Sequence, residues 1–125
     1  MIARLDQNRA QQRLPSRASL NESPMLVFYE LTQACDLVCQ HCRACAQRRS
    51  HPFELTTEES KRLIQQLTRF PRPPMLILTG GDPLKRPDVY ELIQYATDQG
   101  LSVSITPSAT PLVTRNAIRR LRDAG

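Results

Sequence analysis

The sequence predicts an α/β fold built from three consecutive strand–helix units with parallel strands. Three short apolar runs, at residues 25–31, 75–78 and 101–105, are each followed by a segment with helical spacing of apolar residues. Strands that alternate with helices in this way form a parallel sheet with right-handed crossovers. Three units do not close a barrel, so the pattern is that of the first part of a larger domain.

The first run, residues 25–31, is apolar and aromatic except for Glu30. Such a run is typical of a strand buried on both faces of a parallel sheet, and we expect that burial here. The residues that follow it would then lie at the carboxyl end of the strand. Barrels and open sheets of the α/β class place their ligand sites at that edge.

The first helix is predicted to begin at Thr56. Thr56 and Glu59 match the Thr-x-x-Glu capping box, in which each residue binds a backbone amide at the start of the helix. Leu63, Ile64 and Leu67 then fall on one helical face. The proline-rich residues 70–74 end the helix and lead to the second strand.

The second and third units follow the same plan. The second helix is predicted to start near Pro87, a residue suited to a first turn, and to stop at Gly100. A third helix is predicted from about Thr114. The apolar residues expected on the inner faces of these two helices are Val89, Leu92, Ile93, Ala96, Ala117, Ile118 and Leu121.

The bulk composition indicates one soluble globular domain at residues 24–125 after a flexible tail at residues 1–23. The chain has 125 residues, of which 40% are hydrophobic and 23% charged, which is within the range of folded proteins. Residues 2–13 are a candidate for a short helix in the tail. We find neither a secretory signal nor a run of about 18 apolar residues that would span a membrane, and we therefore expect a cytoplasmic protein.

The net charge of +5 raises nucleic acid as a partner. The arginines are scattered, however, and the chain has no Trp and only three each of Tyr and Phe. Stacking platforms interleaved with basic residues are therefore lacking. We expect solvated basic faces rather than a nucleic-acid interface.

All four cysteines lie within residues 35–45, and the first three follow the spacing Cys-x3-Cys-x2-Cys at Cys35, Cys39 and Cys42. Clustered thiols in a chain without an export signal favour a metal site over disulfides. Three thiolates within eight residues suit three corners of an iron–sulfur cube and leave one iron without a protein thiolate.

Two other interpretations of the cysteines stay open from the residues alone. A zinc knuckle pairs two Cys-x2-Cys hairpins about a dozen residues apart, whereas here Cys39/Cys42 and Cys42/Cys45 share a residue. A four-cysteine electron-transfer cluster would include Cys45, although such runs usually take their fourth ligand from farther along the chain.

A second motif, Gly80-Gly81-Asp82-Pro83, follows the second apolar run. It is expected beside the cysteine loop, because the carboxyl ends of parallel strands share one edge of the sheet. Adjacent glycines let backbone carbonyls approach a ligand closely, which a Cβ would prevent. On its own the motif is equally compatible with an ordinary turn.

Together, the Cys-x3-Cys-x2-Cys loop and the Gly-Gly-Asp-Pro turn resemble the radical S-adenosylmethionine (radical SAM) superfamily over residues 25–125. The resemblance implies three βα units of a partial TIM-like barrel, with a [4Fe-4S] cluster and S-adenosylmethionine as cofactors. S-adenosylmethionine would chelate the open iron through its amino and carboxylate groups. Reductive cleavage of its C–S bond would give a 5′-deoxyadenosyl radical, which abstracts hydrogen from a substrate.

The resemblance also assigns roles to individual residues. It implies Cys35, Cys39 and Cys42 as the cluster ligands, and Gly80, Gly81, Asp82 and Pro83 as contacts of the methionine ammonium. The family has Gly-Gly-Glu-Pro at the latter place, so Asp82 is shorter by one methylene.

Further positions receive weaker assignments. His41 occupies the place of an aromatic residue near the adenine, or is a solvated loop residue. Ser108, with Thr106, Pro107 and Thr110, is expected either to line the cofactor or substrate cavity or to make local turn contacts. Arg43 would balance the negative charge of the cluster or lie in solvent. Cys45 stands where many relatives have a small residue, and we expect it to be a bystander.

The phrases around Cys42 and Gly80 are most similar to members with a C-terminal SPASM-type extension, which include peptide-modifying maturases and haem-modifying enzymes. The resemblance therefore implies an enzyme that acts on a peptide or a tetrapyrrole. It implies as well an electron donor of the flavodoxin or ferredoxin type. As a fragment, the chain is expected to be inactive alone. The alternatives are an iron–sulfur electron-transfer module and a catalytically silent truncated fragment.

Overall fold

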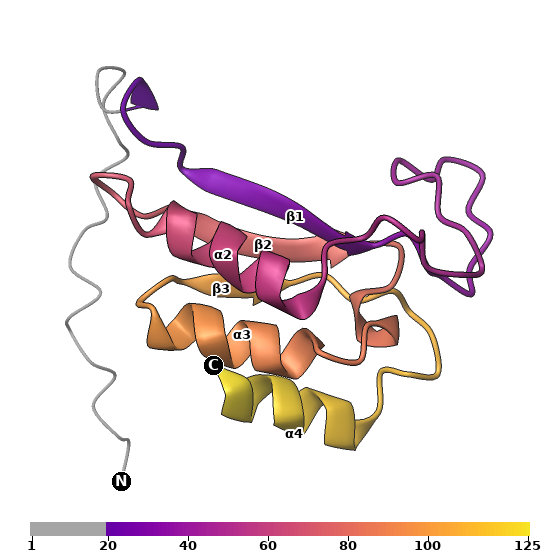
Figure 1. The fold of residues 1–125 in the computed structure, drawn as a ribbon. Coiled ribbons are helices and arrows are strands. Elements are labelled where there is room, and N and C mark those ends of the chain that lie inside the picture. Colours follow the sequence, from indigo (N-terminus) through magenta and orange to yellow (C-terminus); the bar gives the residue numbers. More distant parts are fainter. Residues whose placement is uncertain (1–19) are drawn as a thin grey trace, which may run out of the picture.

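The computed structural model describes residues 20–125 (Figure 1). The helix expected over residues 2–13 and most of the expected tail lie outside the described residues. Ser23, the last residue assigned to that tail, is buried, and its hydroxyl oxygen accepts a hydrogen bond from the Arg72 amide at 3.2 Å. The division of the chain at residue 23 stays a prediction.

Strands and helices alternate along residues 26–125, as the sequence predicts. In chain order the elements are β1 (Leu26–Thr32), α2 (Thr57–Leu67), β2 (Met75–Gly80), the 3-10 helix η1 (Pro83–Lys85), α3 (Val89–Asp98), β3 (Val103–Ile105) and α4 (Arg115–Ala124). None of the helices within residues 20–125 is long and apolar enough to cross a bilayer.

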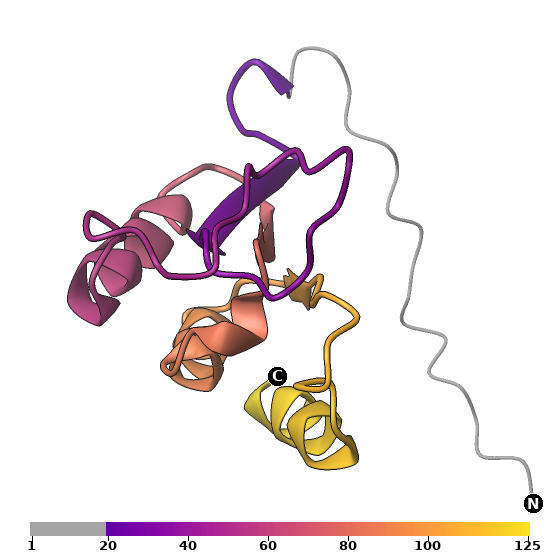
Figure 2. The ribbon, with the colours of Figure 1, turned by 90° about the vertical axis from the view of Figure 1, so that its right-hand side faces the viewer.

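The three strands form one parallel sheet in the order β1-β2-β3. Phe28 is aligned with Ile77, and Ile77 with Ser104, so these side chains share one face of the sheet. Helices α2, α3 and α4 all cover the opposite face (Figures 1 and 2). A parallel sheet with helices on one side has the construction of a barrel wall, and the predicted partial α/β fold is confirmed.

The core lies between the sheet and its helices. Leu76 and Leu78 of β2 are fully buried there, against Ile64 of α2 and Leu92 of α3. Complete burial of one such side chain stabilises the fold by about 1.5–3 kcal/mol. The alternating inward positions of β2 and the helical spacing in α2 and α3 therefore account for the layer arrangement.

The expectation that the first strand is buried on both faces is wrong for the described chain. Tyr29 and Leu31 point into the core, whereas Leu26 and Phe28 are exposed, with Phe28 61% exposed. Met75 of β2 lies on the same uncovered face as Leu26, with which it is aligned. The apolar run alone could not show that the helices cover only one side.

The predicted helix ends are mostly correct. Thr56 is the N-cap of α2, and the reciprocal bonds of its capping box with Glu59 are both present. Gly100 follows α3 with a φ of +84°, a backbone conformation that favours glycine. Two details differ: Val89 rather than Pro87 opens α3, because residues 83–85 form η1 first, and Ile118 of α4 is 55% exposed.

Candidate functional site

The cysteine-containing loop leaves the carboxyl end of β1 and is closed at its base by a short parallel bridge between Ala34 and Gln47. The Cys35 amide donates to the Gln47 carbonyl at 2.7 Å, and the Gln47 amide donates to the Gln33 carbonyl at 2.8 Å. Residues 35–46 therefore form a loop whose two ends are held together at the sheet edge.

The four thiols are free and differ in burial. Cys35 is buried, Cys42 is half-buried, and Cys39 and Cys45 are exposed. Backbone amides lie near two of the sulfurs, with Leu37 N at 3.4 Å from Cys35 Sγ and Ala46 N at 3.3 Å from Cys42 Sγ. No three Cys, His, Asp or Glu side chains of residues 20–125 are arranged to hold a single metal ion.

Cys45 lies in a tight turn with Cys42. Its amide donates to the Cys42 carbonyl at 3.3 Å, and its φ is +46°, in the left-handed region. A residue other than glycine in that region is uncommon, which sets this position apart from the preceding cysteines. The turn is held further by the Gln47 side-chain amide, which donates to the Cys45 carbonyl at 3.0 Å.

The Gly80-Gly81-Asp82-Pro83 turn packs directly against the start of the cysteine loop. The Gly81 amide donates to the Thr32 carbonyl at 2.8 Å, and the Asp82 amide donates to the Ala34 carbonyl at 2.7 Å. A Cβ on Gly80 would lie 2.4 Å from the Thr32 oxygen, and one on Gly81 would lie 2.5 Å from the Ala34 oxygen. The neighbouring backbone alone therefore requires glycine at both positions, whether or not a ligand binds there.

Asp82 is fully buried and its carboxylate is engaged within the protein. One oxygen accepts from the Leu84 amide at 3.1 Å, and the other accepts from the Thr110 hydroxyl at 2.7 Å. Asp82 thus caps η1 and fixes the loop after β3. The contact of Asp82 with a methionine ammonium stays a prediction.

Ser108 joins the loops that follow all three strands. Its hydroxyl donates to the Gly81 carbonyl at 2.7 Å and lies 3.6 Å from Cys35 Sγ. The predicted proximity of the cysteine loop, the glycine turn and the residues after β3 is therefore present.

The other predicted site residues make fewer contacts with this junction. Thr106 is exposed, and Thr110 is buried against Asp82 as a turn contact. His41 is exposed and has no hydrogen-bond partner among residues 20–125.

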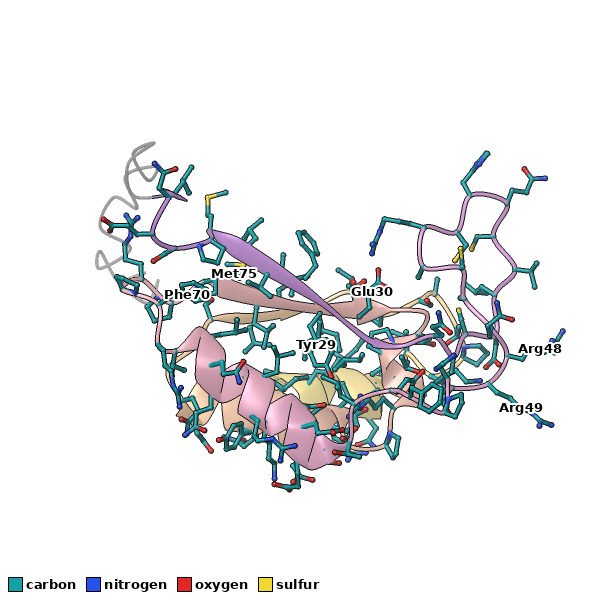
Figure 3. All side chains as sticks on the ribbon, turned by 45° about the horizontal axis from the view of Figure 1, so that its top comes forward. Tyr29, Glu30, Arg48, Arg49, Phe70 and Met75 are labelled. Atoms are coloured by element: carbon teal, nitrogen blue, oxygen red, sulfur yellow. The ribbon has the colours of Figure 1, made fainter. Side chains whose placement is uncertain are left out.

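Two ion pairs connect the cysteine loop to β1 and to η1. Arg43 binds Glu30 of β1 at 2.5 Å, and Asp36 accepts from Lys85 of η1 at 2.5 Å. Arg43 thus has a carboxylate partner on the uncovered face of the sheet (Figure 3). Exposed pairs of this kind contribute at most about 1 kcal/mol each, so they orient the loop more than they stabilise it.

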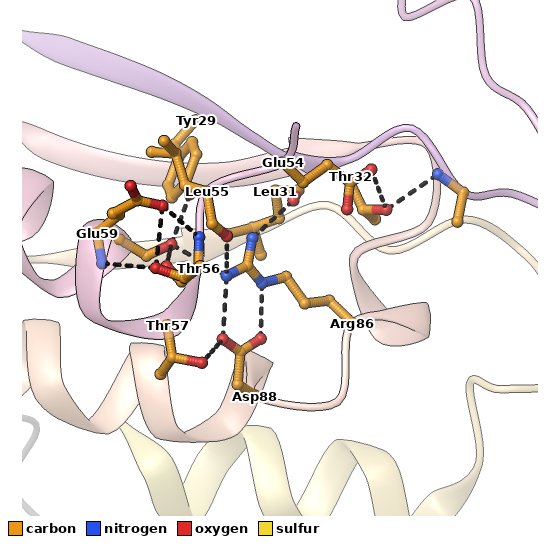
Figure 4. Close-up of polar contacts among 12 residues, drawn as sticks. Tyr29, Leu31, Thr32, Glu54, Leu55, Thr56, Thr57, Glu59, Arg86 and Asp88 are labelled. Atoms are coloured by element: carbon orange, nitrogen blue, oxygen red, sulfur yellow. Dashed lines mark hydrogen bonds and ion pairs between the residues drawn. The ribbon is translucent and has the colours of Figure 1, made fainter. Parts of the chain in front are cut away.

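The buried Arg86 connects the chain segments on either side of the cysteine loop (Figure 4). Arg86 forms a bidentate pair with Asp88, at 2.6 and 3.0 Å. It also donates to the carbonyls of Leu31 at 2.9 Å and Leu55 at 2.8 Å. Ser60 links this group to Tyr29, with the two hydroxyl oxygens 2.8 Å apart. One guanidinium therefore ties the end of β1 to the starts of α2 and α3.

These contacts shift the pKa values of the charged groups. Burial raises the pKa of Asp88, but hydrogen bonds from Arg86 and Thr57 outweigh it and hold that pKa below its ordinary value. Burial lowers the pKa of Arg86, but the hydrogen bonds to Asp88 and its negative charge outweigh burial, so this pKa lies above its ordinary value. Glu54, which accepts from the Gln33 and His51 amides and from the Thr32 hydroxyl, has a lowered pKa because these donors outweigh its burial.

No sequence pattern predicts the roles of Glu54, Arg86 and Asp88, or the hydrogen bond between Thr110 and Asp82. Arg86 and Asp88 stand two residues apart in a charged, proline-containing stretch that gives no sign of burial. The only sequence feature that could have indicated burial of Arg86 and Asp88 is their position between the glycine turn and the following helix.

We predict that Asp88→Asn destabilises the protein by about 3–5 kcal/mol at neutral pH, because it leaves the buried Arg86 charge unpaired. The folded pKa of Asp88 is depressed, so its contribution is complete above the unfolded value of about 3.9 and is lost as pH falls through the lower folded value. Urea unfolding at a series of pH values should show the gap between wild type and variant closing in acid.

The matched control is Asp123→Asn, which removes an exposed carboxylate paired with Arg122. It should change stability by less than about 1 kcal/mol. A gap between wild type and Asp88→Asn that stays constant from neutral to acid pH would contradict the assignment.

Comparison with known proteins identifies the family. Residues 29–125 match the model of the Radical SAM superfamily. The AdoMet-dependent heme synthase of Oleidesulfovibrio alaskensis is 44% identical over 100 residues, which are 80% of this chain and 25% of that protein. The Fe-coproporphyrin III synthase of Methanosarcina barkeri is 35% identical over 120 residues, 94% of this chain and 29% of the relative.

A peptide-modifying relative matches the same region. The PqqA peptide cyclase of Rhodopseudomonas palustris is 35% identical over 102 residues, 82% of this chain and 26% of that protein. The chain thus spans between a quarter and a third of the length of these relatives. Proteins of this superfamily use a [4Fe-4S] cluster and S-adenosylmethionine. The resemblance inferred from the cysteine loop and the glycine turn is confirmed, and this chain belongs to the radical SAM superfamily.

Proposed function

We propose that this chain forms the N-terminal part of a radical SAM catalytic domain, in which Cys35, Cys39 and Cys42 hold the [4Fe-4S] cluster. The observation that carries the proposal is the junction of the two motifs. The amides of Gly81 and Asp82 are bonded to the backbone just before Cys35, so the cluster ligands and the cofactor turn share one rigid support.

The donor set suits a cube better than a single ion. A cube presents its irons at separate corners, so its thiolates stay apart rather than converge on one point. The three cysteines are free thiols on one loop, and amides already lie beside the sulfurs of Cys35 and Cys42. Cys45 is then left over, and we propose that it is not a ligand, so that one iron remains open to S-adenosylmethionine.

When bound, the cluster and S-adenosylmethionine would supply a one-electron reduction and a carbon radical that abstracts hydrogen. The protein's part is to bind and orient. We propose that the Gly80–Gly81 backbone and Asp82 receive the methionine end, with Pro83 fixing the turn. Ser108 orients the Gly81 carbonyl and the Cys35 thiol, and His41 is placed near the adenine.

We propose a tetrapyrrole as the substrate. The heme synthase relatives are 41–44% identical to this chain, whereas the peptide cyclases and maturases are 34–35% identical. A peptide is the second candidate, because those peptide-modifying relatives match the same residues. We propose further that a flavodoxin- or ferredoxin-type donor supplies the electron, and that the protein works in the cytoplasm, where thiols stay reduced.

The electron-transfer alternative differs in one observable property. A module that only carries electrons needs no open iron, and added S-adenosylmethionine would leave its paramagnetic spectrum unchanged. A change in that spectrum on addition of S-adenosylmethionine therefore separates the two functions.

We predict that alanine substitution of Cys35, Cys39 or Cys42 abolishes cluster binding. Each change removes one of three thiolates, and the thiolate–iron absorption near about 400 nm should disappear. Iron analysis and absorption spectra after anaerobic reconstitution measure the outcome. Cys45→Ala is the matched control and should keep both the cluster and its response to S-adenosylmethionine. Full cluster retention in Cys39→Ala would disprove the ligand assignment.

We predict that Gly81→Ala weakens cluster retention although it changes no ligand. Its Cβ would lie 2.5 Å from the Ala34 carbonyl and must displace the base of the cysteine loop. Such overpacking costs about 1–3 kcal/mol, and the displaced loop should release iron to a chelator faster than in wild type.

Gly100→Ala is the control for backbone strain alone. Gly100 has a positive φ, but an added Cβ there meets no atom within 4 Å. This variant should lose stability while its iron release stays as in wild type. Equal iron release from Gly81→Ala and Gly100→Ala would contradict the idea that the glycine turn positions the cysteine loop.

A further inference from the structure

Three peptide groups lead from the end of β1 to Cys35, and each of them is hydrogen-bonded on both sides. Their carbonyl oxygens all accept backbone amides, in the pairs Thr32–Gly81, Gln33–Gln47 and Ala34–Asp82. On the amide side, Cys35 donates to the Gln47 carbonyl at 2.7 Å. The other two amides, those of Gln33 and Ala34, donate to side chains instead.

Glu54 accepts the hydrogen bonds on this amide side. The Gln33 amide donates to Glu54 Oε1 at 2.8 Å, and the Thr32 hydroxyl donates to the same oxygen at 2.9 Å. The Thr32 hydroxyl oxygen in turn accepts from the Ala34 amide at 3.0 Å. Glu54 thus lies against Thr32 at the end of β1 (Figure 4). One carboxylate oxygen therefore orients two successive peptide groups, the first directly and the second through one hydroxyl.

The position of Glu54 is itself fixed by its neighbours. Its amide donates to the His51 carbonyl at 3.1 Å, and its Oε1 accepts from the His51 amide at 2.8 Å. The next residue, Leu55, is held by Arg86, which also binds the Leu31 carbonyl. The carboxylate therefore joins the segment before the cysteine loop to the segment after it, at a set distance from β1.

We propose that Glu54 is a positioning residue for the [4Fe-4S] cluster, because it sets the direction in which the backbone enters Cys35. This role of Glu54 deepens the proposed function and rests on it, since Cys35 is a proposed ligand. The reach of the side chain, rather than its charge, is the property required. Three donors converge on one oxygen, and a neutral amide oxygen at the same distance can also accept them.

Two conservative variants separate reach from charge in the complete protein that contains this chain. Glu54→Asp keeps the charge and shortens the side chain by one methylene, whereas Glu54→Gln keeps the length and removes the charge. Hydrogen exchange is measured first, on protein without its cluster. In Glu54→Asp the amides of Gln33 and Ala34 should exchange at least about tenfold faster than in wild type. In Glu54→Gln their exchange should stay within about threefold of wild type.

The paramagnetic spectrum of the reduced cluster is measured next, on reconstituted protein. Glu54→Asp should shift or broaden this spectrum and weaken its response to S-adenosylmethionine, because the Cys35 thiolate is displaced. Glu54→Gln should show the wild-type spectrum and response. A purely structural role would lower the stability of the fold without altering the spectrum of the molecules that remain folded.

Glu59→Asp is the matched control. Glu59 accepts from the same kinds of donor, the Thr56 amide and the Thr56 hydroxyl, both at 2.9 Å, but at the start of α2. This variant should leave the spectrum unchanged and the exchange of the Gln33 and Ala34 amides within about twofold of wild type.

The role of Glu54 is overturned if Glu54→Asp leaves the exchange of the two amides unchanged, or if it alters the spectrum no more than Glu59→Asp does. It is overturned as well if Glu54→Gln alters the exchange and the spectrum as much as Glu54→Asp. Failure of the proposed function would appear separately, as the absence of a cluster in wild-type protein.

Discussion

Two backbone hydrogen bonds hold the site together, from the Gly81 amide to the Thr32 carbonyl and from the Asp82 amide to the Ala34 carbonyl. They extend the pairing of β1 with β2 beyond the regular strands and into the loops. The close approach is possible only because residues 80 and 81 have no Cβ. Cys35, the first of the proposed cluster ligands, thus directly follows a backbone segment that the glycine turn holds in place. Ser108 then joins the third strand's loop to the same point.

Arg86 and its partners also hold the start and the end of the cysteine loop in position. Arg86 lies in the core, where an unpaired charge would be strongly destabilising, and its cost is offset by Asp88 and two carbonyls. Those carbonyls belong to Leu31 and Leu55, on either side of the cysteine loop. The guanidinium therefore fixes the distance between the two chain segments from which the loop departs. Ion pairs from Arg43 and Lys85 orient the loop itself.

Much of this arrangement could be predicted from sequence because its signals are local. The capping box at Thr56, the glycine after α3 and the alternating βα pattern each depend on a few neighbouring residues, and all are present. The proximity of Cys35 and Gly81 followed from the rule that parallel strands share one carboxyl edge. By contrast, apart from Asp88 and Leu84, the partners of the Arg86 and Asp82 side chains come from segments 26 or more residues away, and no pattern within the chain pairs them. The exposed face of β1 was missed because Phe28 and Leu31 are equally apolar in sequence, although they face opposite sides.

We propose that the cysteine loop and the glycine turn together present an open iron to S-adenosylmethionine. Electron–nuclear double resonance on the reduced, reconstituted complete protein tests it most directly, with S-adenosylmethionine that carries nitrogen-15 in its amino group. We expect a resolved nitrogen-15 coupling to the cluster, which persists in Cys45→Ala. An intact, paramagnetic cluster that shows no such coupling at saturating S-adenosylmethionine would contradict it.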